Sequence, residues 1–432
     1  MVNIFESLQI KAPFLKALND EKYETPTPIQ KKCIPKVLDG FDILGIAQTG
    51  TGKTAAFSIP ILQLLNASQP ENKRRSTRAL FLAPTRELAI QIGSSVRLYG
   101  KYIAFKHTLI YGGVGQKPQV EALKRGVDLI IATPGRLLDL INQGYCKLDK
   151  IEFFVLDEAD RMLDMGFIND VKKIVKVIPK KRQTLFFSAT MPTAVESLAS
   201  NLLYKPEQIS IKPSSTPVEK ISQLVCFVRA EDKRKYLQNL LKEINFYSVI
   251  IFTRTKHGAN RLAAEIKSSN IISDALHGNK SQAARQRTLK DFKSGKVNVL
   301  VATDIAARGI DIEGISHVIN YELPNVPEDY IHRIGRTARA GASGTAISMC
   351  APNEQPFLKS IEKLMGLSIK ISDGQPSTNK DEINKKLQRK STNKFSKKNI
   401  SSSKNSVNKE NSSKGTPNKN SRFFKKKRKV FG

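Results

Sequence analysis

The chain has 432 residues, and this length predicts two domains, because one hydrophobic core seldom grows beyond about 250 to 300 residues. Apolar residues make up 40% of it, no run reaches about 18 apolar residues, and the N-terminus carries an acid where a signal peptide carries lysines, so we expect a soluble, non-exported protein. The formal net charge of +32 indicates a polyanionic partner, either nucleic acid or an anionic membrane surface. The four cysteines form no Cys-x-x-Cys pair, which argues against a zinc site and against a disulfide framework.

Short apolar runs alternate with helical patterns through most of the chain. In the first half the predicted strands cover residues 42–46, 79–83, 128–132, 152–156 and 184–187. After a stretch rich in Pro and Ser, the alternation resumes with predicted strands at 248–252, 297–302, 317–321 and 345–349. Alternating strands and helices predict a parallel, doubly wound α/β sheet. We therefore expect two such domains, over residues 1–211 and 221–372, joined by a linker at 212–220.

The end of the chain, residues 373–432, is dominated by Lys, Asn and Ser. Its few large apolar side chains cannot offset the entropy lost on ordering, so we expect a disordered basic tail. The tail ends in RFFKKKRKVFG, in which Phe423, Phe424 and Phe431 interleave with basic residues. Such a run is typical of a nuclear-import signal or of a nucleic-acid patch, and the aromatic rings, which can stack on bases, favour contact with RNA.

The segment AQTGTGKT follows a predicted strand and opens a predicted helix, which is the context that a phosphate-binding loop requires. Backbone N–H groups of the loop are expected to surround the phosphates; the loop consists of Ala47, Gln48, Thr49, Gly50, Thr51 and Gly52. Lys53 is expected to reach the outer phosphates, and the hydroxyl of Thr54 to bind magnesium. The predicted cofactors are therefore ATP and Mg²⁺.

Two carboxylates, Asp157 and Glu158, come directly after the apolar run IEFFVL. Because ligands bind at the carboxyl ends of parallel strands, Asp157 is placed to hold magnesium and Glu158 to orient and deprotonate the attacking water. The alternative is an acidic helix N-terminus, since Asp and Glu also favour that position. The phosphate-binding loop upstream favours the catalytic interpretation.

A third motif, HRIGRTARAG, places Arg333, Arg336 and Arg339 three residues apart in the second domain. On a helix this spacing puts the guanidinium groups on one face, where they can neutralise charge on a transferring phosphoryl group. The alternative is a surface helix with salt bridges.

Together these motifs resemble a DEAD-box RNA helicase over about residues 1–370. The first half has PTPIQ, AQTGTGKT, PTRELA, a Gly-Gly pair, TPGR, DEAD and SAT in that order, and the second half has Phe252, Gln282 with Arg285, ATDIAARGID and the arginine motif. The short N-terminus and basic tail look most like the bacterial RhlE-type branch. The resemblance implies two tandem RecA-like domains with an active site divided between them.

The resemblance also implies which residues hold the nucleotide. Gln30 is expected to read the adenine edge, with Phe5 and Tyr23 packed near the ring, although Phe5 could also be an ordinary helix anchor. In the second domain, Gly309 is expected near the γ-phosphate, Asp311 at the ribose, and Arg336 with Arg339 as the pair of arginine fingers. The one visible departure is Ala338, where the common form of the motif has glycine.

The resemblance further implies an RNA site and a link between the two sites. The residues expected to hold the sugar-phosphate backbone are Thr85, Arg86, Gly113, Thr133, Arg136, Thr255, Gln282, Arg285 and Thr303. Those expected to couple RNA to ATP are Asp160, Ser188, Thr190 and His332. Contacts to the backbone carry no base information, so binding should be independent of sequence and sensitive to salt. Taken alone, Thr133 or Thr255 could simply cap a helix.

The expected function is an ATP-dependent RNA helicase that separates short duplexes by local strand separation. We expect a cytoplasmic monomer that binds RNA single strands and short duplexes, with ribosomal or RNA-decay proteins as candidate partners and no membrane contact. Two alternatives stay open at this point. One is a binding module in which ATP locks an RNA clamp while the tail anneals strands, and the other is a DNA helicase of the same superfamily.

Overall fold

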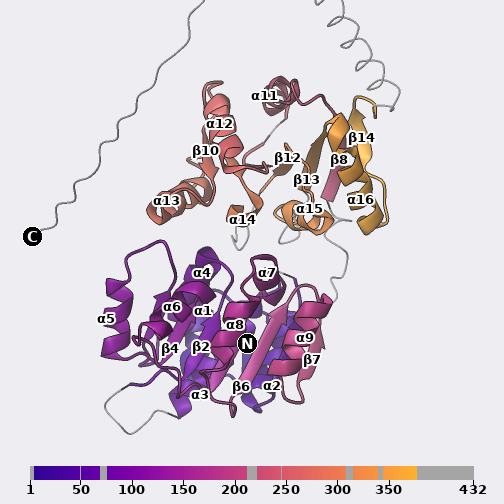
Figure 1. Ribbon diagram of the computed structural model, residues 1–432. Coiled ribbons are helices and arrows are strands. Elements are labelled where there is room, and N and C mark those ends of the chain that lie inside the picture. The colour runs from indigo at the N-terminus through magenta and orange to yellow at the C-terminus, as the bar shows by residue number, and fades with distance from the viewer. Residues whose placement is uncertain are drawn as a thin grey trace, which may run out of the picture. The chain divides into compact units, whose positions relative to one another are not determined.

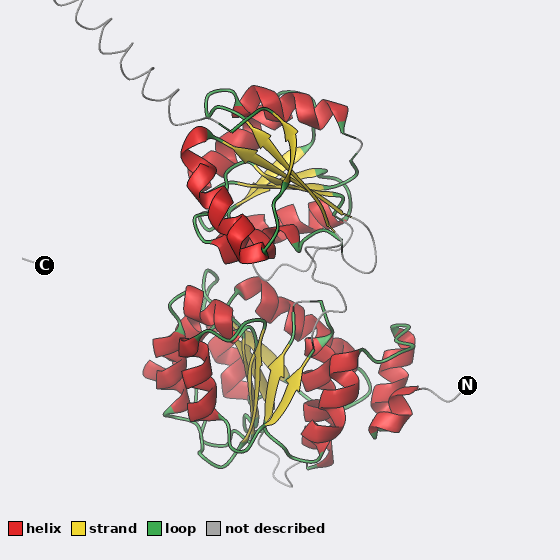
Figure 2. Cartoon of the chain, turned by 90° about the vertical axis from the view of Figure 1, so that its right-hand side faces the viewer, coloured by secondary structure: helices red, strands yellow, loops and turns green. Residues whose placement is uncertain are grey.

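The computed structural model describes residues 4–48, 50–68, 75–211, 221–244, 246–307, 315–338 and 344–376. These residues form two parallel sheets of seven strands each, with helices on both faces of each sheet (Figures 1 and 2). The prediction of two parallel, doubly wound α/β domains is thereby confirmed. The predicted linker at 212–220 lies outside the described residues, as does the tail from residue 377 onward.

The first sheet has the strand order β3-β4-β2-β5-β6-β1-β7. Its strands are β1 (Ile43–Ile46), β2 (Ala79–Leu82), β3 (His107–Ile110), β4 (Leu129–Ala132), β5 (Phe153–Leu156), β6 (Gln183–Ser188) and β7 (Glu207–Ser210). Its helices are η1 (Ile4–Leu8), α1 (Ala12–Asp20), α2 (Pro28–Leu38), α3 (Lys53–Ala67), α4 (Arg86–Tyr99), α5 (Lys117–Arg125), α6 (Pro134–Asn142), α7 (Ala159–Asp164), α8 (Ile168–Val175) and α9 (Thr193–Leu202). All the strand pairs are parallel, so every strand ends at the same edge.

Both faces of this sheet are buried, which explains the continuous apolar runs of its central strands. On one face, Phe81, Val155 and Phe187 pack against α2, α3 and α4. On the other face, Phe154 and Phe186 pack against α6 to α9. Neighbouring residues of one strand therefore belong to different cores, and burial on both sides holds each strand in register.

The second sheet has the strand order β10-β11-β9-β12-β13-β8-β14. Its strands are β8 (Ile221–Phe227), β9 (Val249–Phe252), β10 (Ser273–Leu276), β11 (Val299–Ala302), β12 (His317–Asn320), β13 (Gly344–Cys350) and β14 (Lys370–Asp373). Its helices are α11 (Lys233–Glu243), α12 (Lys256–Lys267), α13 (Gln282–Lys293), α14 (Asp304–Ala307), α15 (Pro327–Ile334), η2 (Pro352–Glu354) and α16 (Gln355–Met365). This sheet is also parallel throughout.

The sequence predicted the central strands and missed those nearer the edges. The missed strands are β3, β7, β8, β10 and β14. Edge strands such as β7 and β14 bury few side chains, so their sequences EQIS and KISD contain no apolar run. No helix among the described residues is long and apolar enough to cross a membrane.

All four cysteines are buried with free thiols. Burial raises the pKa of the Cys33 thiol to about 12. No cluster of metal-ligating side chains occurs in the part of the chain that the structure describes. These thiols therefore behave as small apolar core groups.

Candidate functional site

The phosphate-binding loop leaves β1 and enters α3, at the carboxyl edge of the first sheet. Gly50 and Gly52 have φ angles of +87° and +91°, and a Cβ on Gly52 would lie 2.5 Å from Nε2 of Gln30. Both φ angles favour glycine, and at Gly52 a side chain would also crowd Gln30. Lys53 is buried, and its Nζ donates to the carbonyl of Ala47 at 2.8 Å, which holds the ammonium over the loop. Thr49 lies outside the described residues.

Gln30 joins the start of α2 to this loop. Its Oε1 accepts the N–H of Thr27 at 2.9 Å, and its Nε2 donates to the carbonyl of Gly52 at 3.2 Å. The amide thus fixes the loop from the side where an adenine is expected. Phe5 is fully buried in the core of the first domain, and its ring centre lies 6.4 Å from that of Tyr23. This burial fits the alternative of a helix anchor at Phe5.

Asp157 follows β5 and is 2% exposed. Burial raises the pKa of its carboxyl to about 6, against the opposing attraction of the Lys53 ammonium. Among the described residues its Oδ1 has no hydrogen-bond partner. A buried carboxylate oxygen left without a partner is costly and calls for a ligand.

This oxygen fits a magnesium ion. Mg²⁺ prefers oxygen ligands, and the hydroxyl of Thr54, in the first turn of α3, supplies the second candidate. The donor set of one carboxylate and one hydroxyl matches the way Mg²⁺ is held in phosphate-binding-loop proteins. Asp157 and Thr54 therefore suit the metal predicted from the sequence.

Glu158 is the one residue of the DEAD segment with a strained backbone, at φ +55° and ψ +54°. Its Oε2 accepts a hydrogen bond from Nη1 of Arg161 at 2.9 Å, and both side chains are about 5% exposed or less. The pair fixes the direction of the carboxylate. The sequence motifs do not single out Arg161, although its position three residues after Glu158 on a short helix is a usable signal.

Asp160 connects the carboxylates to the segment after β6. Its Oδ2 accepts hydrogen bonds from the N–H of Ala189 at 3.1 Å, the N–H of Thr190 at 2.8 Å and the Thr190 hydroxyl at 3.0 Å. Its own N–H donates to the Ser188 hydroxyl at 3.2 Å. Four hydrogen bonds therefore tie the DEAD segment to SAT, so a shift of one segment must move the other.

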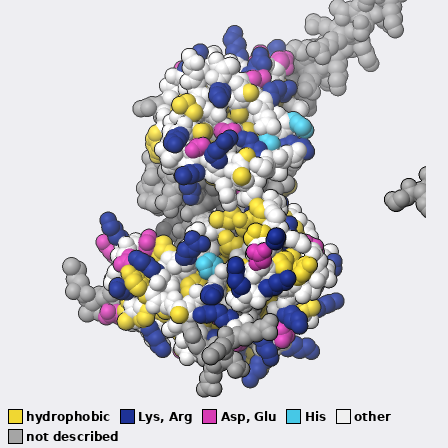
Figure 3. All heavy atoms as spheres, turned by 90° about the vertical axis from the view of Figure 1, so that its left-hand side faces the viewer, with side chains coloured by type: hydrophobic (Ala, Val, Ile, Leu, Met, Phe, Trp, Pro, Cys, Tyr) yellow, Lys and Arg dark blue, Asp and Glu magenta, His cyan; other side chains and the backbone are white. Residues whose placement is uncertain are grey.

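The candidate RNA residues of the first domain lie in loops and in the first turns of α4 and α6, at the carboxyl edge of the sheet. Thr85, Arg86, Thr133 and Arg136 line one hollow, together with Met165 and Phe167, which sequence analysis missed. A Cβ on Gly113 would collide with Nη1 of Arg86, so the glycine makes room for that guanidinium. Lys and Arg side chains are spread over the face shown in Figure 3, with acids between them, rather than gathered in one patch.

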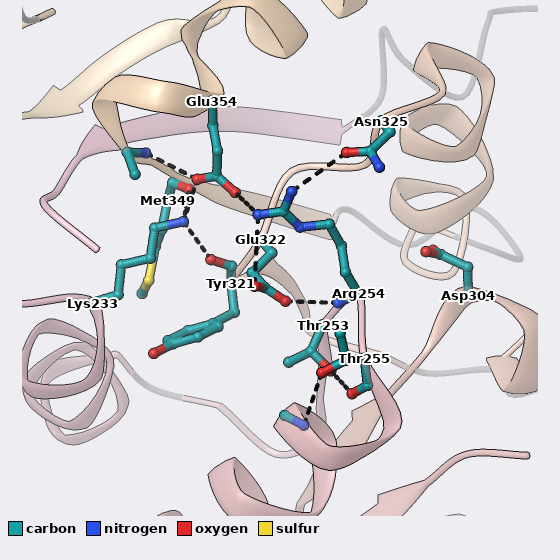
Figure 4. Close-up of polar contacts among 12 residues, drawn as sticks. Lys233, Thr253, Arg254, Thr255, Asp304, Tyr321, Glu322, Asn325, Met349 and Glu354 are labelled. Carbon is teal, nitrogen blue, oxygen red and sulfur yellow. Dashed lines mark hydrogen bonds and ion pairs between the residues drawn. The ribbon is translucent and has the colours of Figure 1, made fainter. Parts of the chain in front are cut away.

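Thr85 and Thr255 cap the helices that they precede, whereas Thr133 does not. Thr85 caps α4, since its Oγ1 accepts the N–H of Leu88 at 3.2 Å. Thr255 caps α12 in the same way, accepting the N–H of Gly258 at 3.0 Å (Figure 4). Thr133 precedes α6 without such a bond. The hydroxyl of Thr133 is therefore not used by its own helix, whereas Thr255 has a structural task as well.

The other candidates of the second domain lie at the carboxyl edge of its sheet. Gln282 and Arg285 stand in the first turn of α13, and Nη2 of Arg285 lies 3.5 Å from the carbonyl of Ala306. Thr303 follows β11 and is 9% exposed. Gly309 and Asp311 lie outside the described residues.

The expectation that three arginines share one helical face is wrong. Helix α15 ends at Ile334, so Arg336 lies beyond it, and Arg339 is outside the described residues. Arg333 is fully buried and pairs with Asp304 at 2.5 and 2.8 Å. Its guanidinium also stacks over Phe252 at 5.0 Å, so Arg333 supports the second domain from within.

Arg336 is 4% exposed, and its Nε lies 3.3 Å from the carbonyl of His332. Ala338 has φ +55°, a left-handed conformation that disfavours any residue with a Cβ. The glycine of the common motif would adopt it without strain. The departure at Ala338 therefore stores local strain within the arginine motif.

Comparison with known proteins matches both halves of the chain. The DEAD/DEAH box helicase family model matches residues 27–198, and that of the helicase conserved C-terminal domain matches 232–341. The ATP-dependent RNA helicase CshA of Listeria monocytogenes is 42% identical over 363 residues, which are 83% of this chain and 68% of that protein. The ATP-dependent RNA helicase DeaD of Escherichia coli is 44% identical over 366 residues, which are 84% of this chain and 57% of that protein.

Solved structures show the same similarity. The structure of S. cerevisiae Dbp5 bound to RNA and ADP BeF3 matches with a TM-score of 0.76 at 34% identity, covering 90% of this chain and 99% of that chain. The structure of Mss116p bound to ssRNA and AMP-PNP matches with a TM-score of 0.75 at 30% identity, covering 87% and 79%. The similarity thus extends over both sheets. Because these relatives are named CshA and DeaD, the assignment to the RhlE-type branch stays a prediction.

Proposed function

Because the chain belongs to the DEAD/DEAH box helicase family, we propose that it hydrolyses ATP in response to RNA and uses that cycle to separate short RNA duplexes or remodel ribonucleoprotein. The observation that carries this proposal is the buried Asp157: its Oδ1 has no hydrogen-bond partner within the described part of the chain, and the Lys53 ammonium of the phosphate-binding loop attracts its carboxylate. Relatives solved with RNA and an ATP analogue support the choice of both ligands.

In the proposed cycle the loop from Ala47 to Gly52 surrounds the phosphates with backbone N–H groups, and Lys53 moves from the Ala47 carbonyl to the phosphate oxygens. Gln30 reads the adenine edge through its amide. Thr54 and Asp157 would hold magnesium, which would supply positive charge to offset that of the phosphates.

Glu158 is the proposed general base. Its carboxylate takes a proton from water as the water oxygen bonds to the γ-phosphorus and the bond to the bridging oxygen of ADP breaks. Arg161 aims the carboxylate before the reaction. Arg336 and Arg339 are proposed to neutralise the charge that develops on the phosphoryl group, and Asp311 and Gly309 to contact the nucleotide.

RNA is proposed to bind through the nine backbone-contact candidates and to act on ATP through the hydrogen bonds of Asp160 to the Ser188–Thr190 segment. A shared set of bonds is a physical route by which one ligand changes the affinity for the other. His332, in the last turn of α15, is proposed to take part in this coupling.

A monomer in the cytoplasm, with ribosomal or RNA-decay proteins as partners, is the setting that we propose for this activity. Mass determination by light scattering tests the monomer, and crosslinking of RNA in cells followed by sequencing identifies the substrate. Parallel RNA and DNA duplexes test the sugar preference, because a DNA helicase would unwind the DNA duplex, whereas an RNA-specific helicase would unwind the RNA duplex alone.

The direct test of the proposed function is ATP turnover with and without RNA, in the parent protein and in Glu158→Gln. We expect RNA to stimulate the parent, and the variant to lose about a hundredfold or more in turnover, because Gln cannot accept the proton. The matched control is Glu196→Gln on α9, which removes an exposed carboxylate outside the site and should keep parental turnover. Turnover in the parent that ignores RNA, or survives in Glu158→Gln, contradicts the proposal.

A further inference from the structure

A network of charged side chains crosses the carboxyl edge of the second sheet (Figure 4). It runs from Lys233, at the start of α11, through Glu354 in η2 to Arg254, which follows β9, and ends at Glu322, which follows β12. Its members come from four segments that are distant in sequence. None of them was singled out by the motifs.

The innermost part of this network is a buried ion pair. Lys233 is 3% exposed and Glu354 is 1% exposed. The ammonium of Lys233 donates to the carboxylate of Glu354, to the Tyr321 carbonyl at 2.7 Å and to the Met349 carbonyl at 2.9 Å. All three of its protons are therefore used. Burial lowers the pKa of Lys233, while Glu354 opposes that shift.

Glu354 in turn holds Arg254. One oxygen of its carboxylate accepts from Lys233 and from the N–H of Ala351, and the other accepts from Nη2 of Arg254 at 3.0 Å. Nη1 of Arg254 also lies 3.4 Å from Oδ1 of Asn325. The guanidinium is thereby anchored on its inner side, although the side chain is 31% exposed. A buried carboxylate that accepts hydrogen bonds from three donors is held in one position.

Glu322 connects this network to two functional segments, the Thr253–Thr255 turn and the arginine motif. Its carboxylate accepts the backbone N–H of Arg254 at 2.7 Å, inside the Thr253–Thr255 turn. Its own carbonyl accepts a hydrogen bond from Nη1 of Arg333 at 2.6 Å, within the arginine motif, which begins in the last turn of α15. Its N–H lies 3.3 Å from the Phe252 carbonyl. One residue thus bonds to both segments through different atoms.

We propose that Glu322 is a positioning residue that fixes the position of the Thr253–Thr255 turn relative to the arginine motif. The network formed by Lys233, Glu354 and Arg254 is its anchor. The inference rests on the proposed function, because it takes Thr255 as an RNA contact and Arg336 as a contact to ATP. It goes beyond that function by naming residues to which the proposed function assigns no ligand contact.

The geometry has one measurable consequence. Removing the carboxylate of Glu322 frees the Arg254 N–H, breaks the 3.7 Å ion pair with the Arg254 guanidinium and loosens the turn, while the bonds of its backbone carbonyl and N–H remain. RNA should then bind less well and also stimulate turnover less, whereas turnover without RNA should stay the same. A residue that only stabilises the fold would lower both activities through the amount of folded protein.

The experiment compares Glu322→Ala and Glu322→Gln with Glu328→Ala and Glu328→Gln in the full chain. Glu328 is an exposed acid at the start of α15, six residues further along the chain than Glu322. The measurements are ATP turnover against RNA concentration, turnover without RNA, and the thermal unfolding midpoint. Turnover without RNA shows whether the ATP site is intact in each variant.

We expect Glu322→Ala to raise the half-saturating RNA concentration about fivefold to tenfold and to lower the RNA-stimulated rate by a similar factor, as the removal of a charge-assisted hydrogen bond predicts. Glu322→Gln should stay within about twofold of the parent, because its amide oxygen still accepts the Arg254 N–H. Both Glu328 variants should match the parent.

The inference is overturned if Glu322→Ala behaves like Glu328→Ala, or if it lowers turnover with and without RNA by one common factor. Should Glu322→Ala unfold too readily to assay, the double change Lys233→Met with Glu354→Gln removes the anchor instead and should give the same loss of RNA stimulation. If the parent itself is not stimulated by RNA, the proposed function fails, and that outcome is distinct from a normal parent with an unaffected Glu322→Ala.

Discussion

At the scale of single residues, the candidate site contains buried carboxylates in unfavourable surroundings. Asp157 is almost completely buried, carries a raised pKa of about 6 and leaves one oxygen without a partner among the described residues. Glu158 holds a left-handed backbone and a buried ion pair with Arg161. Such features are unfavourable for folding, and they are typical of positions whose chemistry needs a ligand.

Asp157→Asn should therefore stabilise the protein when nucleotide and magnesium are absent. The folded pKa of about 6 lies above the ordinary value of 3.8, so the folded protein binds a proton more tightly than the unfolded chain between these values. Stability then falls as pH rises through that window, and the loss is complete above pH 6. At pH 7.5 we expect Asp157→Asn to gain about 1 to 3 kcal/mol in the free energy of unfolding.

Urea unfolding at pH 7.5 and pH 4 measures this gain. At pH 4 the parent carboxyl is already protonated in the folded state, so the two proteins should differ little. Asp149→Asn, which removes an exposed carboxylate in the same domain, is the control and should change stability by less than about 0.5 kcal/mol. An Asp157→Asn protein that is less stable than the parent at pH 7.5 would contradict the prediction.

At the scale of elements, several helix N-termini follow strands at the edge that carries the site. Thr85 and Thr255 cap α4 and α12 through their hydroxyls, so two proposed RNA contacts also begin helices. Capping and RNA contact make different demands on charge. A capping acceptor can be anionic, whereas a group beside RNA phosphate cannot be anionic without repulsion.

Thr255→Asp separates the two tasks. Aspartate caps helices as well as threonine does, so the free energy of unfolding should stay within about 0.5 kcal/mol of the parent. RNA affinity should fall about tenfold or more, because the added carboxylate faces phosphate. Fluorescence anisotropy with single-stranded RNA and chemical unfolding are the two measurements. Thr255→Ser, the control, should preserve both, and unchanged RNA affinity in Thr255→Asp would leave Thr255 as a cap alone.

At the scale of the whole molecule, the protein contains two parallel sheets and has a strongly basic composition. Both sheets place their candidate residues at the carboxyl edge, which is where loops of parallel sheets bind ligands. The formal net charge of +32 is spread along the sequence, and the last residues are basic as well. Electrostatic binding of RNA should therefore draw on the core and on the residues after Pro376 together.

Removal of residues 377–432 should weaken RNA binding and keep unwinding. The slope of log affinity against log salt is expected to become less negative by about 0.7 for each RNA phosphate that the shortened chain no longer neutralises. Strand-displacement assays and salt titrations of the full and shortened chains measure both effects. A shortened chain that cannot unwind, together with a tail that anneals strands alone, would favour the binding-module alternative.

Much of the fold could be predicted because the central strands are buried on both faces and therefore consist of apolar residues. Runs such as ALFL and FFVL are recognisable in the sequence, and β7 and β14 are not, since most of their side chains face solvent. The phosphate-binding loop and the carboxylates after β5 were equally visible, because their chemistry requires particular residues at fixed spacing.

The sequence by itself determined the parallel α/β class and the family resemblance, and it predicted Lys53, Asp157 and Glu158 as the centre of the site. Only the tertiary structure decided that Arg333 faces Asp304, that Arg161 holds Glu158, and that Glu322 bonds to two segments at once. The reason is physical. Local spacing specifies which side chains can share a helix or a strand end, whereas ion pairs between distant segments depend on how the strands are ordered in the sheet.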